Sequence, residues 1–80
     1  MNEMVGKWAY GKVNPMIYEF HSNGEFSLDG RLTCKYTVPY SGRIEFTGSG
    51  SVVVNEYKIK GDTLKLDLLD GEKPLEFERV

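Results

Sequence analysis

Residues 57–64 read Tyr57-Lys58-Ile59-Lys60-Gly61-Asp62-Thr63-Leu64, with apolar and polar side chains alternating on both sides of the Gly-Asp pair. Alternation with a period of two is typical of a β-strand that has one buried face. A two-residue loop that starts with Gly joins two antiparallel strands tightly. In such a hairpin Ile59 lies opposite Leu64, so both side chains point to the same side of the sheet. This stretch predicts an antiparallel hairpin with a continuous apolar face.

The other turns extend the pattern along the whole chain. In residues 20–26, Phe-His-Ser-Asn-Gly-Glu-Phe, a three-residue loop that ends in Gly sets Phe20 opposite Phe26. The remaining loops predict the pairs Tyr10–Tyr18, Trp8–Phe20, Phe26–Leu32, Val38–Ile44, Phe46–Val53 and Leu68–Leu75. Strands are expected at residues 6–12, 16–21, 25–28, 31–38, 43–47, 52–60, 63–69 and 74–80.

The register decides which side chains point inward, because a slip of one residue would reverse every side chain of a strand. The predicted inward set is Trp8, Tyr10, Met16, Tyr18, Phe20, Phe26, Leu32, Cys34, Tyr36, Val38, Ile44, Phe46, Val53, Asn55, Tyr57, Ile59, Leu64, Leu66, Leu68, Leu75, Phe77 and Arg79. An open sheet with this apolar face would leave unpaired edges and an exposed core. We therefore predict an all-β fold, an eight-stranded antiparallel up-and-down mini-barrel, with a partly open barrel or a sandwich as the alternative.

Length and charge limit the domain count and the partners. The chain has 80 residues, which predicts one domain over residues 1–80, and a formal net charge of −2 with acidic and basic residues interspersed. This charge gives no long-range attraction to phosphate backbones or anionic lipid. We expect neither nucleic-acid binding nor membrane insertion.

Targeting signals and cysteine content bear on localisation. Residues 1–5 lack the basic and apolar regions of a signal peptide, and no apolar run approaches the length of a membrane span. We expect a soluble chain that is cytoplasmic as written, or a domain excised from an exported protein. Cys34 is the only cysteine, which excludes an internal disulfide and predicts a thiol in the core.

The two chain ends should meet in the barrel. In an eight-stranded meander, the first strand starts and the last strand ends at the same end of the barrel. Both Trp8 and Arg79 have the inward parity, so we predict that the Arg79 guanidinium stacks on the indole and closes the barrel floor, a contact worth about 0.5–2 kcal/mol. The alternative is an Arg79 head that reaches solvent at a frayed terminus.

Four segments resemble a known family in the same order along the chain. Gly6-Lys7-Trp8 matches the G-x-W that opens the first strand of lipocalins and fatty-acid-binding proteins, and Phe77-Glu78-Arg79-Val80 supplies a late Arg like the one that covers this Trp in lipocalins. With residues 20–26 and 57–66, they resemble the small bacterial lipocalin-like domains. The resemblance implies a non-enzymatic module that binds a small apolar or amphipathic ligand in the barrel mouth. The chain departs from true lipocalins in its short length, its short loops and the absence of a flanking helix.

The interior of an eight-stranded barrel is just wide enough to be filled by side chains or to hold one small ligand. The inward set is rich in aromatic residues, so we expect it to fill most of so short a barrel. If a pocket exists, it should lie at the end away from Trp8 and Arg79. Its candidate ligand-binding residues are Tyr10, Tyr18, Tyr36, Asn55 and Tyr57. The tyrosines could equally be ordinary barrel lining, and Asn55 could turn outward at a bulge or hydrogen-bond a neighbour.

Catalytic chemistry finds little support in the residue pattern. The only histidine, His21, has the outward parity beside a turn and should be solvated, and its neighbour Ser22 cannot adopt nucleophile–base geometry with it. The carboxylates Asp29, Asp62 and Asp70 lie next to Gly in turns, where they serve backbone geometry. We therefore predict no catalytic residue, no metal site, no cofactor and no enzymatic activity.

The outer wall suggests a second type of function. The register puts outward Val54 opposite Leu69, with Val52 beside them, and three neighbouring aliphatic groups form a candidate interaction patch. The alternative hypothesis is therefore a structural or protein-interaction domain with a filled barrel, which recognises a protein partner or a second copy of itself through this patch.

Overall fold

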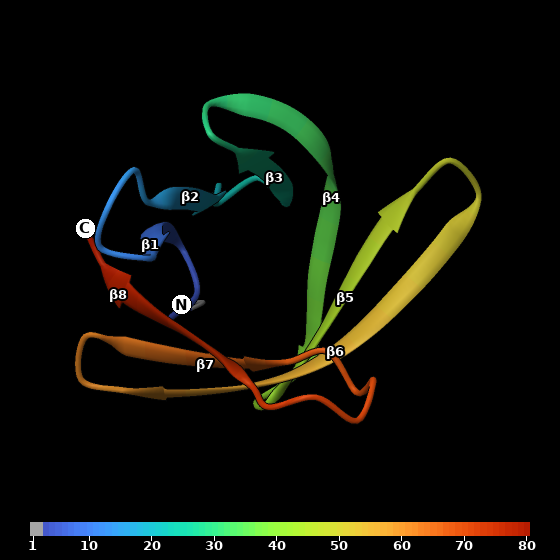
Figure 1. Ribbon diagram of the computed structural model, residues 1–80. Coiled ribbons are helices and arrows are strands. Elements are labelled where there is room, and N and C mark those ends of the chain that lie inside the picture. Colours follow the sequence, from blue (N-terminus) through green and yellow to red (C-terminus); the bar gives the residue numbers. More distant parts are fainter. Residues whose placement is uncertain (1–2) are drawn as a thin grey trace.

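The computed structural model describes residues 3–80, so the first two residues of the predicted domain lie outside the described residues. Eight strands form a closed barrel in which each strand pairs antiparallel with the next and β8 pairs with β1 (Figure 1). The strands are β1 (Gly6–Tyr10), β2 (Met16–Phe20), β3 (Glu25–Leu28), β4 (Arg31–Tyr40), β5 (Arg43–Gly48), β6 (Ser51–Lys60), β7 (Thr63–Asp67) and β8 (Leu75–Arg79). The predicted all-β, eight-stranded up-and-down barrel is confirmed, and a lipocalin-like architecture is consistent with it. Within residues 3–80, no helix has the length and apolar character needed to cross a membrane.

Three of the predicted hairpins have the predicted register. Ile59 pairs with Leu64 across Gly61-Asp62, Phe20 pairs with Phe26, and Phe46 pairs with Val53. Gly24 has a φ of 89° at the end of the Phe20–Phe26 loop, a value that L side chains rarely adopt. The turn residues therefore predicted the register correctly at these three loops.

The register of β1 against β2 differs from the prediction by two residues. Trp8 pairs with Tyr18 rather than with Phe20, and Tyr10 pairs with Met16. The loop between these strands therefore has five residues instead of three. Because a shift of two residues keeps every side chain on its own face, the inward assignment was correct although the pairs were wrong.

The end of β7 was also predicted wrongly. Asp67 is the last residue of the strand, its carboxylate Oδ1 accepts a hydrogen bond of 2.9 Å from the Leu69 N–H, and Leu69 has a φ of 59°. This side-chain turn replaces the ladder after Asp67. As a result Leu66, not Leu68, pairs with Leu75.

A β-bulge in β4 moves one predicted core residue to the surface. Phe26 pairs with Cys34 but Ser27 pairs with Leu32, so Thr33 is an extra residue with no partner in the ladder. Leu32 is 63% exposed, which makes its predicted inward position wrong. A second irregularity lies further along β4, where the ladder against β5 shifts between Thr37 and Tyr40 and interrupts the predicted Val38–Ile44 pair.

The buried core lies toward the barrel end where the chain starts and finishes. Its hydrophobic members are Met4, Trp8, Phe20, Phe26, Tyr36, Ile44, Tyr57, Leu64, Leu66 and Phe77. Other predicted inward residues, Tyr10, Val53 and Leu68, are 39%, 56% and 39% exposed, and they lie near the opposite rim. The barrel is thus packed at one end and thinly covered at the other.

Arg79 closes the packed end as predicted. Its guanidinium Cζ lies 4.1 Å from the centroid of the Trp8 ring. Nη1 donates a hydrogen bond to the Val5 carbonyl at 3.3 Å, and Nη2 donates one to the Glu3 carbonyl at 3.1 Å. The guanidinium is therefore held by an aromatic face and two backbone acceptors, which contradicts a frayed terminus.

Met4 is a core residue that the strand pattern did not reveal. Its side chain is fully buried, although it precedes β1, and its carbonyl accepts a hydrogen bond of 3.0 Å from the Trp8 indole Nε1. Gly6 opens β1 with a φ of 129°, and a Cβ at this position would lie 3.0 Å from Arg79 Nη1. The Gly of the G-x-W segment therefore makes room for the arginine that covers the Trp.

We expect Trp8→Ala to lower the free energy of unfolding by about 3–5 kcal/mol, because it removes a fully buried ring and leaves a cavity in the floor. Trp8→Phe should cost less, because it keeps a ring beneath Arg79 and loses only the indole hydrogen bond. Urea unfolding of both variants checks this order. An unchanged midpoint for Trp8→Ala would refute its place in the core.

Candidate functional site

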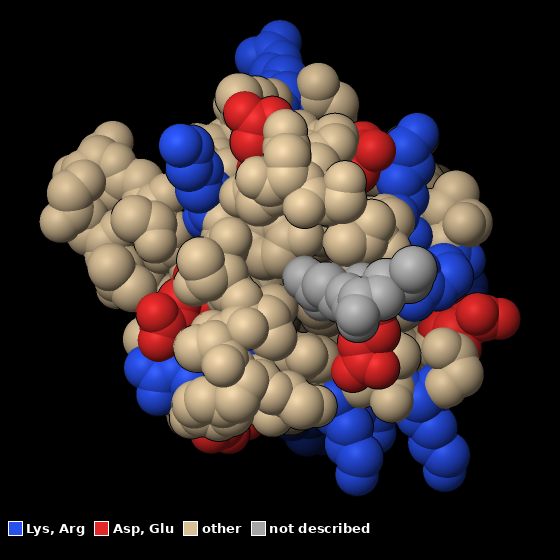
Figure 2. All heavy atoms as spheres, turned by 180° about the vertical axis from the view of Figure 1, so that it is seen from behind, with Lys and Arg blue, Asp and Glu red and all other residues tan. Residues whose placement is uncertain are grey.

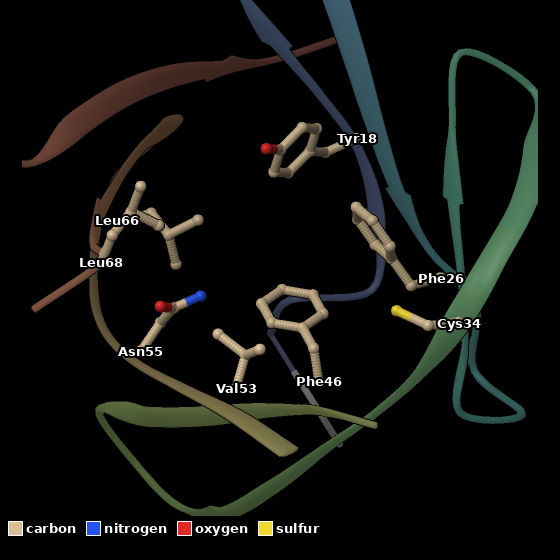
Figure 3. A pocket seen from close by; sticks show the side chains of 8 residues that line it. All are labelled: Tyr18, Phe26, Cys34, Phe46, Val53, Asn55, Leu66 and Leu68. Carbon is tan, nitrogen blue, oxygen red and sulfur yellow. The ribbon is translucent and has the colours of Figure 1, made fainter. Parts of the chain in front are cut away.

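A cavity of about 240 Å³ lies inside the barrel at the end away from Trp8, and we refer to it as the end cavity. Figure 3 shows its lining side chains arranged around one common space. They come from β2, β3, β4, β5, β6, β7 and the loop that follows β7, and they are Tyr18, Phe26, Cys34, Phe46, Val53, Asn55, Leu66 and Leu68. Val53 and Leu68 are exposed lining residues, so the cavity is open to solvent at the rim of the barrel.

Side chains fill the inner part of the barrel, and the end cavity is the space left toward the rim. In the inner part, Phe20 lies 5.0 Å from Phe26 and 5.1 Å from Tyr36 between ring centroids. Nearer the rim, the bulge in β4 turns Leu32 outward, and Tyr10 is largely exposed while it leans on Phe77 at 5.3 Å. Because neither of these two side chains occupies the upper interior, space remains there.

Asn55 is the most unusual residue of the cavity wall. It points inward opposite Ile44, as the register predicted, and it is only 3% exposed. Among residues 3–80 its Oδ1 has no hydrogen-bond partner. A buried acceptor without a partner costs about 1–3 kcal/mol. Asn55 therefore does not turn outward at a bulge, and its Oδ1 does not accept a hydrogen bond from a neighbouring Tyr.

Tyr18 is the second polar group at the end cavity. Its ring packs edge-on against Phe26 at 5.0 Å, and Figure 3 shows its hydroxyl directed into the space between the lining side chains. Burial raises the pKa of the Tyr18 hydroxyl, so this group is neutral at physiological pH and can both donate and accept a hydrogen bond.

The other predicted ligand-binding tyrosines lie elsewhere. Tyr36 is buried and its hydroxyl donates a hydrogen bond of 2.8 Å to the His21 carbonyl, while Tyr57 is buried outside the lining of the end cavity. Tyr10 lies at the surface beside Phe77. Of the five candidates, the structure brings together Tyr18 and Asn55 at one cavity.

The remaining wall residues were predicted to point inward but not to line a site. Each is an apolar or sulfur-containing side chain: Phe26, Cys34, Phe46, Val53, Leu66 and Leu68. Parity alone cannot tell a residue that is packed against a neighbour from one that faces a cavity.

Cys34 lies half-buried in this wall, where burial raises the pKa of its thiol. A protonated thiol is a weak nucleophile and behaves as a small apolar group. Cys34 therefore contributes to the surface of the cavity rather than to covalent chemistry.

His21 differs from the solvated loop residue that the sequence suggested. It is half-buried, its Nε2 lies 2.9 Å from Ser27 Oγ, and its Nδ1 lies 3.8 Å from Glu19 Oε2. A serine, a histidine and a carboxylate thus gather on the outer wall of β2 and β3. Ser27 is only 6% exposed, and 3.8 Å is too long for the hydrogen bond that orients a catalytic histidine. The contact between His21 and Ser27 satisfies a buried hydroxyl.

The candidate interaction patch is less compact than predicted. Val52 and Leu69 are exposed and Val54 is half-buried. Val54 pairs with Glu45 on β5, but β7 ends at Asp67, so the ladder does not bring Leu69 opposite Val54. Single exposed aliphatic side chains are common on protein surfaces and need no partner.

Charges are dispersed over the surface. Figure 2 shows Lys and Arg interspersed with Asp and Glu on one face, without a continuous area of one sign. On the outer wall of β6 and β7, a groove of about 300 Å³ is lined by Lys58, Lys60, Thr63 and Lys65. These lysines are exposed, so salt screens their attraction for anions. Among residues 3–80, no cluster of three or more His, Cys, Asp or Glu could hold a metal ion.

Comparisons with protein-family models, curated proteins and solved structures found no match. The class of protein is therefore defined by its fold and site: a small closed β-barrel with an end cavity.

We expect Cys34 in the folded protein to react with iodoacetamide more slowly than in urea, and to reach its full rate at a higher pH. The reason is that burial raises the pKa of the thiol and so lowers the thiolate fraction at any given pH. The rate of alkylation as a function of pH, followed by mass spectrometry, checks this. A folded-state midpoint at or below that of the unfolded chain would contradict it.

We expect Asn55→Leu to raise the free energy of unfolding by about 1–3 kcal/mol, because it removes a buried acceptor without a partner and leaves a side chain of similar size. Thermal or urea unfolding provides the measurement. A loss of stability would mean that the amide is satisfied within the folded protein, for example by an ordered water.

Proposed function

We propose that this protein is a non-enzymatic small-ligand-binding module of the lipocalin-like type, and that its ligand occupies the end cavity. The observation that carries the proposal is the buried Asn55 amide, whose Oδ1 lacks a partner, in the wall of an otherwise largely apolar cavity. Binding sites for small molecules are typically concave and mostly apolar, with a few polar groups that fix orientation. The resemblance of the G-x-W segment and the late Arg to lipocalins supports the same function.

The geometry of the barrel also favours this function over an outer-wall interaction domain. The end cavity offers a ligand a volume of about 240 Å³, whereas the ladder does not bring Leu69 opposite Val54 to form the outer-wall patch. The packed floor at Trp8 gives the cavity a rigid base. A ligand can therefore enter from the rim without disturbing the contacts that hold the barrel closed.

A dye titration tests the proposal. We expect an apolar dye whose emission depends on its environment to bind saturably to the protein, with a dissociation constant on the order of tens of micromolar or lower. Val53→Trp should abolish this binding, because Val53 lines the mouth and a larger ring there would fill the cavity.

Val52→Trp is the matched control for this experiment. It adds the same ring at the neighbouring position of β6, where the side chain points outward and is similarly exposed. This variant should bind the dye like the unchanged protein. Absence of saturable binding, or equal loss in both variants, would refute a ligand site inside the barrel.

A further inference from the structure

We propose that the end cavity selects a neutral ligand with a hydroxyl group, an alcohol or a phenol, which forms a hydrogen bond with the side-chain amide of Asn55. This inference rests on the proposed function and specifies the chemical class of the ligand. Three observations support it: Asn55 Oδ1 has no hydrogen-bond partner among residues 3–80, the cavity wall has no charged side chain, and the cavity has a small volume.

The polar requirement comes from the Asn55 side chain. Its Oδ1 is buried without a donor among residues 3–80, and Figure 3 shows the amide in the cavity wall with its nitrogen toward the space between the lining side chains. A pure hydrocarbon would leave this acceptor unpaired. A hydroxyl group both donates and accepts, so it pairs with the carbonyl or with the NH₂ end of the amide. The Tyr18 hydroxyl at the same space offers a second contact to the ligand oxygen.

The charge requirement comes from the whole wall. Its eight side chains include no Lys, Arg, His, Asp or Glu, and the ionisable groups Tyr18 and Cys34 have pKa values raised by burial. A carboxylate or ammonium group that entered this space would lose its hydration without gaining an opposite charge. The cavity therefore disfavours fatty-acid anions and amines, and it favours a neutral polar group.

The size of the cavity restricts the apolar part of the ligand. An apolar cavity of about 150 Å³ accommodates one benzene ring, and sites for drug-sized molecules begin at about 300 Å³. The end cavity, at about 240 Å³, lies between these values. One substituted ring, or an aliphatic chain of similar volume, matches the space.

Three compounds that share one skeleton separate these requirements: 4-ethylphenol, ethylbenzene and 4-ethylbenzoate. Two-dimensional NMR titration of the folded protein at neutral pH gives the dissociation constant of each. We expect the phenol to bind about tenfold more tightly than ethylbenzene, which corresponds to one hydrogen bond to a buried group. The benzoate should bind most weakly of the three.

Asn55→Leu identifies the group responsible. In this variant the affinity for 4-ethylphenol should fall to that for ethylbenzene, and ethylbenzene should bind at least as well as it does to the unchanged protein. Lys58→Ala is the control, because Lys58 is exposed on the outer face of the same strand, and its affinities should equal those of the unchanged protein. If Asn55→Leu fails to fold, the affinities of the unchanged protein for the phenol and for ethylbenzene still test whether the cavity prefers a hydroxyl group.

The outcomes separate this inference from the proposed function. Equal affinity for the phenol and ethylbenzene, or tightest binding of the benzoate, overturns the hydroxyl selectivity while a ligand site remains. Failure of all three compounds together with the apolar dye overturns the ligand site itself. Selectivity for the phenol that survives Asn55→Leu overturns the role of Asn55.

Discussion

The stacking of Arg79 on Trp8 is the contact on which the rest of the barrel depends. Only two residue pairs, Trp8–Arg79 and Ala9–Glu78, join β1 to β8 in the ladder, so the seam that closes the barrel is short. The guanidinium extends this seam with an aromatic contact, and its hydrogen bonds to backbone carbonyls hold the segment before β1 beneath the barrel. Met4 fills the space under the indole because that segment is fixed in place.

The packed floor and the open mouth both follow from where the large side chains lie along the barrel. The largest fully buried residues, among them Trp8, Phe20 and Phe77, lie toward the floor, where they provide most of the apolar burial that stabilises a small domain. The wall of the end cavity contains Asn55, whose buried Oδ1 has no hydrogen-bond partner among residues 3–80 and therefore lowers the stability of the fold. Phe26 and Leu66 belong to both the buried core and the wall of the end cavity, so the packed floor and the cavity meet at these two side chains.

The sequence predicted the number of strands, their order and most inward positions, because alternation and Gly-containing turns act locally. The prediction was wrong where the turn residues and the alternation fit more than one register. The β1–β2 loop can have three or five residues without changing which face Trp8 occupies, so side-chain parity does not distinguish the two registers. The extra residue at Thr33 has no signature in the alternation, so the exposure of Leu32 could not be foreseen. Asn55 and Tyr18 were anticipated at the site, whereas the volume between them depends on those unforeseen shifts.

The seam between β1 and β8 also has a consequence for how the chain is made. The hydrogen bonds of Arg79 to Val5 and Glu3 span 74 and 76 positions of sequence, nearly the longest separations that this domain allows. During synthesis, seven strands leave the ribosome before the eighth can pair with the first. Until then β1 has an unpaired edge and the indole lacks its cover, which makes the nascent chain prone to pairing with other chains. The risk of aggregation therefore falls only when β8 pairs with β1. Slow synthesis or loss of β8 would leave the edge of β1 unpaired.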